Sequence, residues 1–499
     1  MSALLVRYLP RTHTPVRSCN YGMAIARRNY PCKDFSSRSE FRTLYAIITG
    51  VPLQIWKLCP HASGVNSIQA IPAEAPTPRL QHIQFPLNAI EKSIVGGNLA
   101  ILRALRRRAN SASLPVYLVG GPVRDLLLGR PLKDLDFVVE GDAPAVARDV
   151  AQEVGGEVIT YRRFGTATVA LPDCRVDVVT ARRETYARPG ALPDTVAGNI
   201  YEDLARRDFS INSLAAPLAG DSPLLDPQGG RRDLEKGVIR VLHAASFLDD
   251  PTRILRAVRY EQRLGFRLAD ETLAQMLAAV QGGALATISG DRLRGELKRI
   301  LEEASPAPAL ARAAGLGLLA TIHPALGGEA NIPEHLLPAA ASAGPLVYMG
   351  ILAYPLTVGQ AEAVVQRLNM PGEWAKVVRD TVAVRKKEPA LSGPDLPASH
   401  LYHLLEDARP EAVGAAACLS PSPAARERLS RYLTSLRQIS PPLDGNDLLA
   451  MGAPRGTLVG RLLRQLHDAR LDGQITTEPE ARLLAQQWLA QEGDRTKDG

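Results

Sequence analysis

Two aspartates beside a short apolar stretch are the residues in this chain that are most clearly suited to metal binding or catalysis. Asp134 and Asp136 are separated by one apolar residue and followed by three more. In a strand, this alternation puts both carboxylates on one face, while Leu135 and Phe137 point the other way, toward a core. Two carboxylates on one face repel each other unless a cation lies between them, and hard oxygen ligands suit Mg²⁺. The pair therefore predicts a Mg²⁺ site with Asp134 and Asp136 as ligands.

A third acid, Asp177, lies in a second apolar stretch, residues 175–179, which is a candidate for a neighbouring strand. Three acids on adjacent strands could hold two metal ions. One ion would activate a 3′-hydroxyl, and the other would neutralise a leaving pyrophosphate. A solvated sheet edge with two chance aspartates explains the pair alone equally well, so the neighbouring motifs decide between the two interpretations.

A glycine pair, Gly120 and Gly121, stands between an apolar stretch and Pro122, a residue suited to the first position of a helix. Glycine lets the backbone approach a phosphate closely, and the free N–H groups at a helix start bind anions. Arg124, one turn into the helix, could bind a triphosphate through two N–H groups of its guanidinium. Such a turn is more often structural, but its position shortly before the aspartate pair favours a triphosphate site.

The glycine turn with Val123-Arg124-Asp125, followed by Asp134-Leu135-Asp136, resembles the head domain of the CCA tRNA nucleotidyltransferase and poly(A) polymerase family, of the bacterial-eukaryotic class (class II). The resemblance implies an α+β fold, in which a small mixed-sheet nucleotidyltransferase head precedes an all-helical neck, body and tail. It also implies a metal-dependent transfer of nucleotides to an RNA 3′ end.

A second motif, residues 206–212, resembles the arginine–arginine–aspartate motif of that family, with Ser210 in place of threonine. By resemblance, Arg207 contacts the triphosphate, whereas Asp208 and Asn212 lie near the sugar, where hydrogen bonds to the 2′-hydroxyl could separate ribose from deoxyribose. The competing interpretation is a surface helix carrying ion pairs.

The third motif, residues 249–260, resembles the base-reading motif of the family, with Asp249 in place of glutamate. Cytosine and adenine both show an amino donor beside a ring-nitrogen acceptor, whereas uracil and guanine show the reverse. A carboxylate and a guanidinium match the first pattern, so Asp250 and Arg253 could select C and A. By resemblance, Arg256 and Arg259 reach the triphosphate or the RNA end. A solvated basic face over a core also explains this arginine stripe.

The predicted site thus has two groups of residues. The catalytic acids are Asp134, Asp136 and Asp177, with Asp134 and Asp136 as metal ligands; the nucleotide-binding residues are Gly120, Gly121, Arg124, Arg207, Asp208, Asn212, Asp250, Arg253, Arg256 and Arg259.

Hydrophobic periodicity predicts the elements that must position these residues. Strands are expected at 116–119, 135–139, 166–171 and 175–180, with helices at 86–110, 122–128 and 143–154. From Asp249 onward the pattern is almost wholly helical, including 251–264, 270–280 and 290–301. The alternation indicates a small α/β arrangement on a mixed sheet, followed by helices.

The resemblance and these patterns together suggest five segments. They are a basic extension at 1–85, a catalytic head at 86–233, a helical neck for the nucleotide base and RNA at 234–305, a helical body at 306–435 and a tRNA-binding helical tail at 436–499.

The net charge of +7 belongs to the first segment, because residues 1–80 hold ten Lys/Arg and three acids. An RNA-binding surface elsewhere must therefore come from local patches in a balanced chain. The extension fits a mitochondrial transit segment, an RNA-contacting arm or, as we favour, a start placed too early. No apolar run is long enough for a transmembrane helix, and cysteine spacing predicts neither zinc nor disulfides. A cytoplasmic location is expected, or a mitochondrial one if the extension is a transit segment.

The sequence therefore predicts an enzyme that adds CCA to the 3′ end of tRNA from CTP and ATP, with Mg²⁺ as cofactor. The expected partners are the acceptor arm and 3′ end of tRNA, without DNA or membrane. An A-adding enzyme or a poly(A) polymerase is the first alternative. A non-catalytic RNA-binding protein on the same fold is the second, although buried acids without a metal would be costly.

Overall fold

The computed structural model describes residues 90–495, apart from short gaps at 92–93, 95, 112–113, 133, 162–164 and 221 and a longer one at 328–343. The predictions for residues 1–85 lie outside the described residues.

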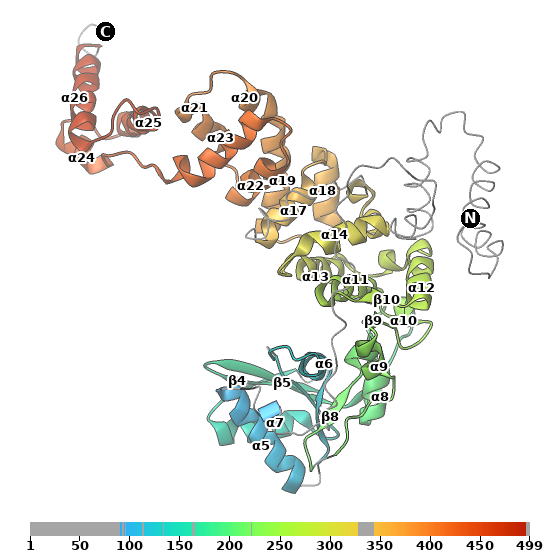
Figure 1. Ribbon diagram of the computed structural model, residues 1–499. Helices are drawn as coiled ribbons and strands as arrows, with labels where there is room; N and C mark the ends of the chain where they lie inside the picture. The colour runs from blue at the N-terminus through green and yellow to red at the C-terminus, as the bar shows by residue number, and fades with distance from the viewer. Residues whose placement is uncertain are drawn as a thin grey trace, which may run out of the picture. The chain divides into compact units, whose positions relative to one another are not determined.

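A six-stranded mixed sheet carries the first half of the described chain, with strand order β3-β4-β5-β2-β1-β8 (Figure 1). The β2–β5 pair is parallel, and the other neighbours are antiparallel. A separate antiparallel hairpin is formed by β6 and β7. The strand bounds are β1 (Val116–Val119), β2 (Asp136–Val139), β3 (Glu157–Tyr161), β4 (Thr166–Leu171), β5 (Cys174–Thr180), β6 (Arg182–Thr185), β7 (Asp194–Ala197) and β8 (Ala215–Pro217).

Both faces of the sheet are covered, because successive strand residues point to opposite sides. On one face, Leu118 and Phe137 belong to the large core that includes α5 and α7. On the other face, Val119 and Val138 pack with side chains of α8. The helices of this head are α5 (Gly97–Ser111), α6 (Gly121–Leu127), α7 (Ala143–Val154) and α8 (Ile200–Ala205).

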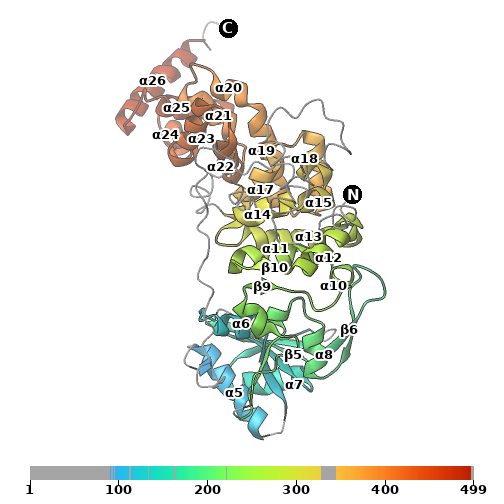
Figure 2. The same cartoon turned by 45° about the vertical axis from the view of Figure 1, so that its right-hand side comes forward.

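Beyond the head the described chain is helical, apart from a short parallel sheet of β9 (Val238–Ile239) and β10 (Arg267–Leu268) (Figures 1 and 2). The helices are α9 (Gly230–Glu235), α10 (Ser246–Asp249), α11 (Thr252–Leu264), α12 (Asp270–Gln281), α13 (Gly290–Leu301), α14 (Pro306–Gly315), α15 (Leu318–Ile322), α17 (Pro345–Ala353), α18 (Val358–Arg367), α19 (Gly372–Lys386), α20 (Glu388–Ser392), α21 (Ala398–Leu405), α22 (Pro410–Leu419), α23 (Pro423–Thr434), α24 (Gly445–Ala450), α25 (Thr457–Leu471) and α26 (Glu478–Arg495). A mixed-sheet head followed by a helical region is the fold class predicted from the sequence.

Hydrophobic cores follow the chain in order. The large core runs from the head through α17–α19, a second lies around α21–α23, and a third joins α24, α25 and α26. The proposed boundaries at 233, 305 and 435 stay predictions. Among the described residues, no helix is long and apolar enough to cross a membrane.

Candidate active site

The three predicted acids lie on or next to the two parallel strands of the sheet. Asp136 is the first residue of β2, and it is paired in register with Asp177 on β5. Asp134 precedes the strand and is exposed, while Asp136 is half-buried. Leu135 is buried, as expected from the alternation. The structure therefore places Asp136 and Asp177 on one side of neighbouring strands, as the sequence predicted.

The acids influence one another electrostatically. Burial raises the pKa of Asp136 above its usual value; the charge of Arg207 opposes this shift, and the charges of Asp177 and Asp134 add to it. The hydroxyl of Thr168 donates to Asp177 at 2.6 Å and orients that carboxylate. Repelling carboxylates of this kind fit a hard divalent cation. Within the described ranges, no group of three or more His, Cys, Asp or Glu side chains could hold an ion. The assignment of Asp134, Asp136 and Asp177 to metal ions therefore stays a prediction.

The glycine turn lies directly before α6, as predicted. Gly120 has φ +72°, a conformation that favours glycine. A Cβ atom built on Gly120 would lie 2.5 Å from Nη1 of Arg207. The backbone conformation therefore favours glycine here, and any larger residue would displace the Arg207 guanidinium.

Replacing Gly120 by alanine is expected to destabilise the protein by about 1–2 kcal/mol, because of the positive φ, and to displace Arg207. We expect a higher KM for the nucleoside triphosphate, measured by steady-state incorporation alongside urea denaturation. Gly129→Ala is the matched control, since Gly129 has φ +66° but no atom lies within 4 Å of the position that a Cβ would take. Equal changes of KM in both variants would contradict the role given to the Arg207 contact.

Arg206 and Arg207 are held by one buried carboxylate, Asp203, which is fully buried. The distances are 2.6 Å from Arg206 Nη2 and 2.9 Å from Arg207 Nη2. Burial opposes ionisation of Asp203, but the two arginine charges outweigh it and lower the pKa of this carboxyl. The ion pairs expected in the alternative interpretation are present. They are not on the surface, however, because Asp203 is buried and both arginines are half-buried.

Asp208 is the centre of a second buried network. Its Oδ2 accepts from Arg256 Nε at 2.9 Å and Nη2 at 2.5 Å, and its Oδ1 accepts from Asn212 Nδ2 at 3.0 Å. Asn212 in turn accepts from Arg124 Nη1 at 2.7 Å. Burial alone would raise the pKa of Asp208, but Arg256 and Asn212 lower it to about 2. The network joins predicted site residues from α6, from the second motif and from α11.

Tyr260 gathers three of the predicted arginines around one ring. The guanidinium carbons of Arg124, Arg256 and Arg259 lie 5.2, 5.7 and 4.9 Å from its centroid, within the range of cation–π attraction. Arg259 also donates to Glu303 at 3.2 Å. Tyr260 belongs to the third motif, yet no role was predicted for it from the sequence.

The interpretation of α11 as carrying a solvated basic face is wrong for most of its arginines. Arg253 and Arg259 are 4% and 7% exposed, Arg256 is half-buried, and Arg263 alone of the four is exposed. The stripe is buried because Arg253 lies against α10 and the Arg206 carbonyl, Arg256 lies against Asp208, and Arg259 lies against Glu303. Its arginines are paired with acids, carbonyl groups and Tyr260 instead of water.

The two predicted base-reading residues lie at the start of α11. Asp250 Oδ1 accepts from the backbone N–H of Thr252, the first residue of α11, at 3.0 Å. Arg253 donates from Nη1 to Ser246 Oγ at 2.6 Å and from Nη2 to the carbonyl of Arg206 at 2.7 Å. Both terminal nitrogens of Arg253 are thus already engaged by the protein, so it is held rigidly between the head and α10.

Besides Tyr260, two residues of this region were missed by the sequence-based prediction. Asp203 could have been found from its spacing of three and four residues before Arg206 and Arg207, which is the spacing of ion pairs on a helix. Arg292 donates to Asp250 from 42 positions away, and no local pattern signals that contact.

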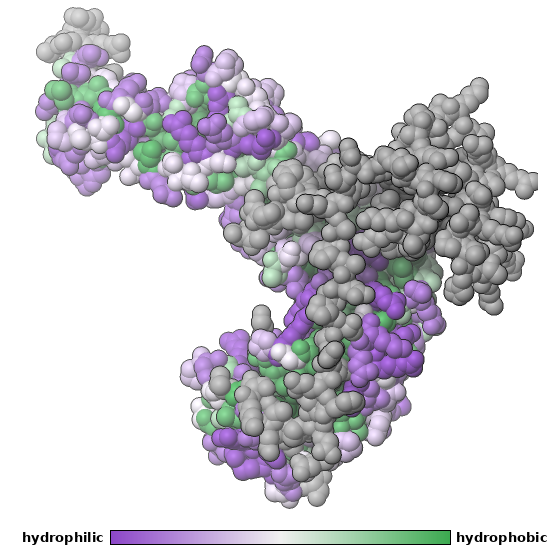
Figure 3. Space-filling view, in the orientation of Figure 1, coloured by the Kyte–Doolittle hydropathy of each residue, from purple (hydrophilic) through white to green (hydrophobic). Residues whose placement is uncertain are grey.

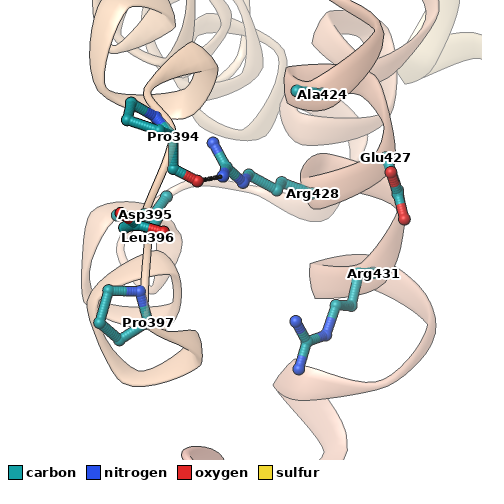
Figure 4. Close-up of a pocket in the computed structure, with 8 residues that line it drawn as sticks. All are labelled: Pro394, Asp395, Leu396, Pro397, Ala424, Glu427, Arg428 and Arg431. Carbon is teal, nitrogen blue, oxygen red and sulfur yellow. Dashed lines mark hydrogen bonds between the residues drawn. The ribbon is translucent and has the colours of Figure 1, made fainter.

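Hydrophilic residues gather over α8 and α9 on the face shown in Figure 3. A separate open groove of about 530 Å³ lies between residues 394–397 and α23 (Figure 4). There Arg428 donates to the carbonyl of Pro394, whereas the exposed Arg431 points from α23 toward the Pro397 side. This groove contains none of the predicted site residues.

Comparison with known proteins finds similarity to nucleotidyltransferases along most of the chain. Residues 116–240 match the poly A polymerase head domain, and residues 265–327 match a probable RNA- and SrmB-binding site of polymerase A. The chain is 37% identical to an A-adding tRNA nucleotidyltransferase of Geobacter sulfurreducens over 78% of this chain, but it spans only 46% of that relative. It is 32% identical to an A-adding tRNA nucleotidyltransferase of Halalkalibacterium halodurans, over 82% of this chain and 96% of the relative.

Among solved structures, the chain is similar to the Thermotoga maritima CCA-adding enzyme complexed with tRNA. The TM-score is 0.64 at 30% identity, and the match covers 81% of this chain and 98% of the other.

Proposed function

The chain belongs to the tRNA nucleotidyltransferases, a family of enzymes, and from this premise we propose that it adds AMP from ATP to the 3′ end of tRNA. The main structural support for nucleotidyl transfer is that Asp136 lies in register with Asp177 on the neighbouring strand. In the same head, the Arg207 guanidinium lies against the glycine turn. The two A-adding relatives favour addition of A.

In the proposed reaction, the RNA 3′-hydroxyl attacks the α-phosphate of the nucleotide, and pyrophosphate leaves. Asp134 and Asp136 would hold Mg²⁺, with Asp177 as third acid. When bound, this ion would offset the charge of the triphosphate and favour the deprotonated hydroxyl. Arg207 would contact the triphosphate beside Gly120 and Gly121, because its guanidinium already lies against that turn.

The other predicted arginines would act from fixed positions. Arg124 and Arg256 hold the Asp208–Asn212 pair, so these two polar residues would meet the ribose in one defined orientation. Arg259 lies against the same tyrosine ring and would complete the positive field around the triphosphate. Asp250 would read the base edge together with those N–H groups of Arg253 that its bonds to Ser246 and the Arg206 carbonyl leave over.

Addition of the whole CCA sequence, which the sequence predicts, is the second candidate. The similarity to the Thermotoga maritima CCA-adding enzyme favours it, because that match covers almost the whole of the solved chain. In either case the helical region would hold tRNA through phosphate charge and shape. The exposed Arg431 in the groove of Figure 4 is a candidate phosphate contact. The relatives are bacterial-type, which favours the predicted cytoplasmic location over a mitochondrial one.

The test is incubation of the protein with Mg²⁺ and labelled ATP or CTP on three RNAs: tRNA lacking CCA, tRNA ending in CC, and an unstructured RNA. Incorporation of A alone, on the CC-ended tRNA, is the expected result. Addition of C, C and A followed by a stop would replace it with the CCA-adding candidate. Extension of the unstructured RNA would indicate a poly(A) polymerase, and no incorporation on any RNA would reject the proposal.

A further inference from the structure

Arg292, near the start of α13, joins two segments that are distant in the chain. Its Nη2 donates to Asp250 Oδ1 at 2.7 Å, and its Nη1 donates to the backbone carbonyl of Gly190 at 2.8 Å. Gly190 lies in the loop that connects β6 and β7. One guanidinium therefore fixes the predicted base-reading carboxylate and the hairpin loop at the same time.

The loop end of this link is tightly placed. Gly190 donates from its backbone N–H to the carbonyl of Leu248 at 3.0 Å. Its φ is +71°, and a Cβ atom there would overlap the hydroxyl of Thr287, so only glycine fits without movement. The carbonyl that accepts from Arg292 is consequently a fixed point rather than a free loop atom.

The other end of the link leaves one carboxylate oxygen available. Asp250 Oδ1 accepts from the N–H and the hydroxyl of Thr252, at 3.0 and 2.5 Å, and from Arg292. Among the described residues, Asp250 Oδ2 accepts no hydrogen bond. Three donors on one oxygen fix the plane of the carboxylate, so the second oxygen has a defined direction in which to accept.

We propose that Arg292 is a positioning residue for base selection: it orients Asp250 so that Oδ2 accepts from the exocyclic amino group of the incoming base. This inference rests on the function proposed above. An arginine suits the position because its planar fork reaches two acceptors at once, whereas a lysine ammonium is a single point charge. The contact to Gly190 also ties the orientation of Asp250 to the placement of the β6–β7 hairpin.

The experiment compares kcat/KM for ATP with kcat/KM for UTP in the wild-type protein and in Arg292→Gln, with tRNA ending in CC as acceptor. The kcat/KM for ATP, whose base has an exocyclic amino donor, should fall in the variant. The kcat/KM for UTP, whose base has none, should not. We expect the ATP to UTP ratio to fall by about ten- to a hundredfold, the factor that accompanies loss of a charged hydrogen bond. Arg292→Lys should retain part of the ratio, since it can still pair with Asp250.

Lys298→Gln is the control on the same helix, because Lys298 makes an exposed pair with Glu302 and touches no predicted site residue. A purely structural role for Arg292 would lower both efficiencies by the same factor and leave the ratio unchanged, which would overturn the inference. Thermal melting of each variant checks folding, and Arg292→Lys carries the test if Arg292→Gln unfolds. Failure of the wild-type protein to incorporate ATP would instead reject the proposed function itself.

Discussion

Replacing Asp136 by alanine is expected to abolish nucleotide incorporation, by at least about a thousandfold, which corresponds to about 4 kcal/mol of transition-state stabilisation. Asp136 is half-buried, lies in register with Asp177 and is close enough to Asp134 for their charges to interact. Its removal would leave the proposed Mg²⁺ with too few protein ligands. The fold should persist, because the substitution relieves repulsion between carboxylates. Steady-state incorporation of labelled ATP measures the loss, and circular dichroism checks the fold.

Asp149→Ala is the matched control for this variant, because Asp149 is an exposed acid on α7 in the same head. It should leave incorporation unchanged. A second comparison is Thr168→Val, which removes the hydroxyl that orients Asp177 and should give a smaller loss than Asp136→Ala. Activity retained by Asp136→Ala would contradict the metal assignment.

Replacing Asp208 by alanine is expected to lower the free energy of unfolding by about 3–5 kcal/mol. Asp208 is 8% exposed, and its carboxylate pairs with Arg256 and holds Asn212. Without it, the Arg256 charge keeps its desolvation cost and loses its nearer acidic partner, because Glu296 lies 3.9 Å from its Nη1. Incorporation should fall as well, since Asn212 and Arg256 lose their fixed positions. Urea denaturation measures the free energy of unfolding, and the KM for the nucleotide shows whether the binding site is disturbed.

Two further variants separate the buried pair from ordinary surface charge. Asp291→Ala removes an exposed partner of Arg294 and should change stability little. The double variant Asp208→Ala/Arg256→Met should be more stable than Asp208→Ala alone, because it removes a largely buried charge whose remaining acid, Glu296, is 3.9 Å away. A single Asp208 variant as stable as the wild-type protein would show that the buried ion pair does not support the fold.

Elements with strong periodicity were predicted closely from the sequence. The bounds of β1, β4, α7 and α13 agree with the expected ranges, because alternating or helical apolar patterns end there at glycine, proline or polar residues. Strand β3 was missed because it lies at the sheet edge with mostly exposed side chains, so it lacks a buried stripe. The β6–β7 hairpin was missed because no residue of either strand is fully buried, so neither strand carries an apolar stripe.

The acids and the glycine turn could be predicted because their partners lie on adjacent elements. The contacts of the arginines could not, since they join distant segments. Arg256 meets Asp208 across 48 positions. Helical spacing shows which residues share a face of α11, but it does not show that Asp208, Ser246 and Glu303 lie against that face. The arginine stripe was therefore compatible with both a solvated and a buried position.

The parallel pairing of β2 with β5 also has a consequence for the order of folding. Asp136 and Asp177 are far apart in the chain, and α7, β3 and β4 lie between them. Helices form early from local contacts, whereas a parallel strand pair must first close a long loop. The acids meet only when that pair has formed. A partly folded chain that is already rich in helix would consequently lack the Asp136–Asp177 pair, and chemical competence would be among the last properties that the protein gains.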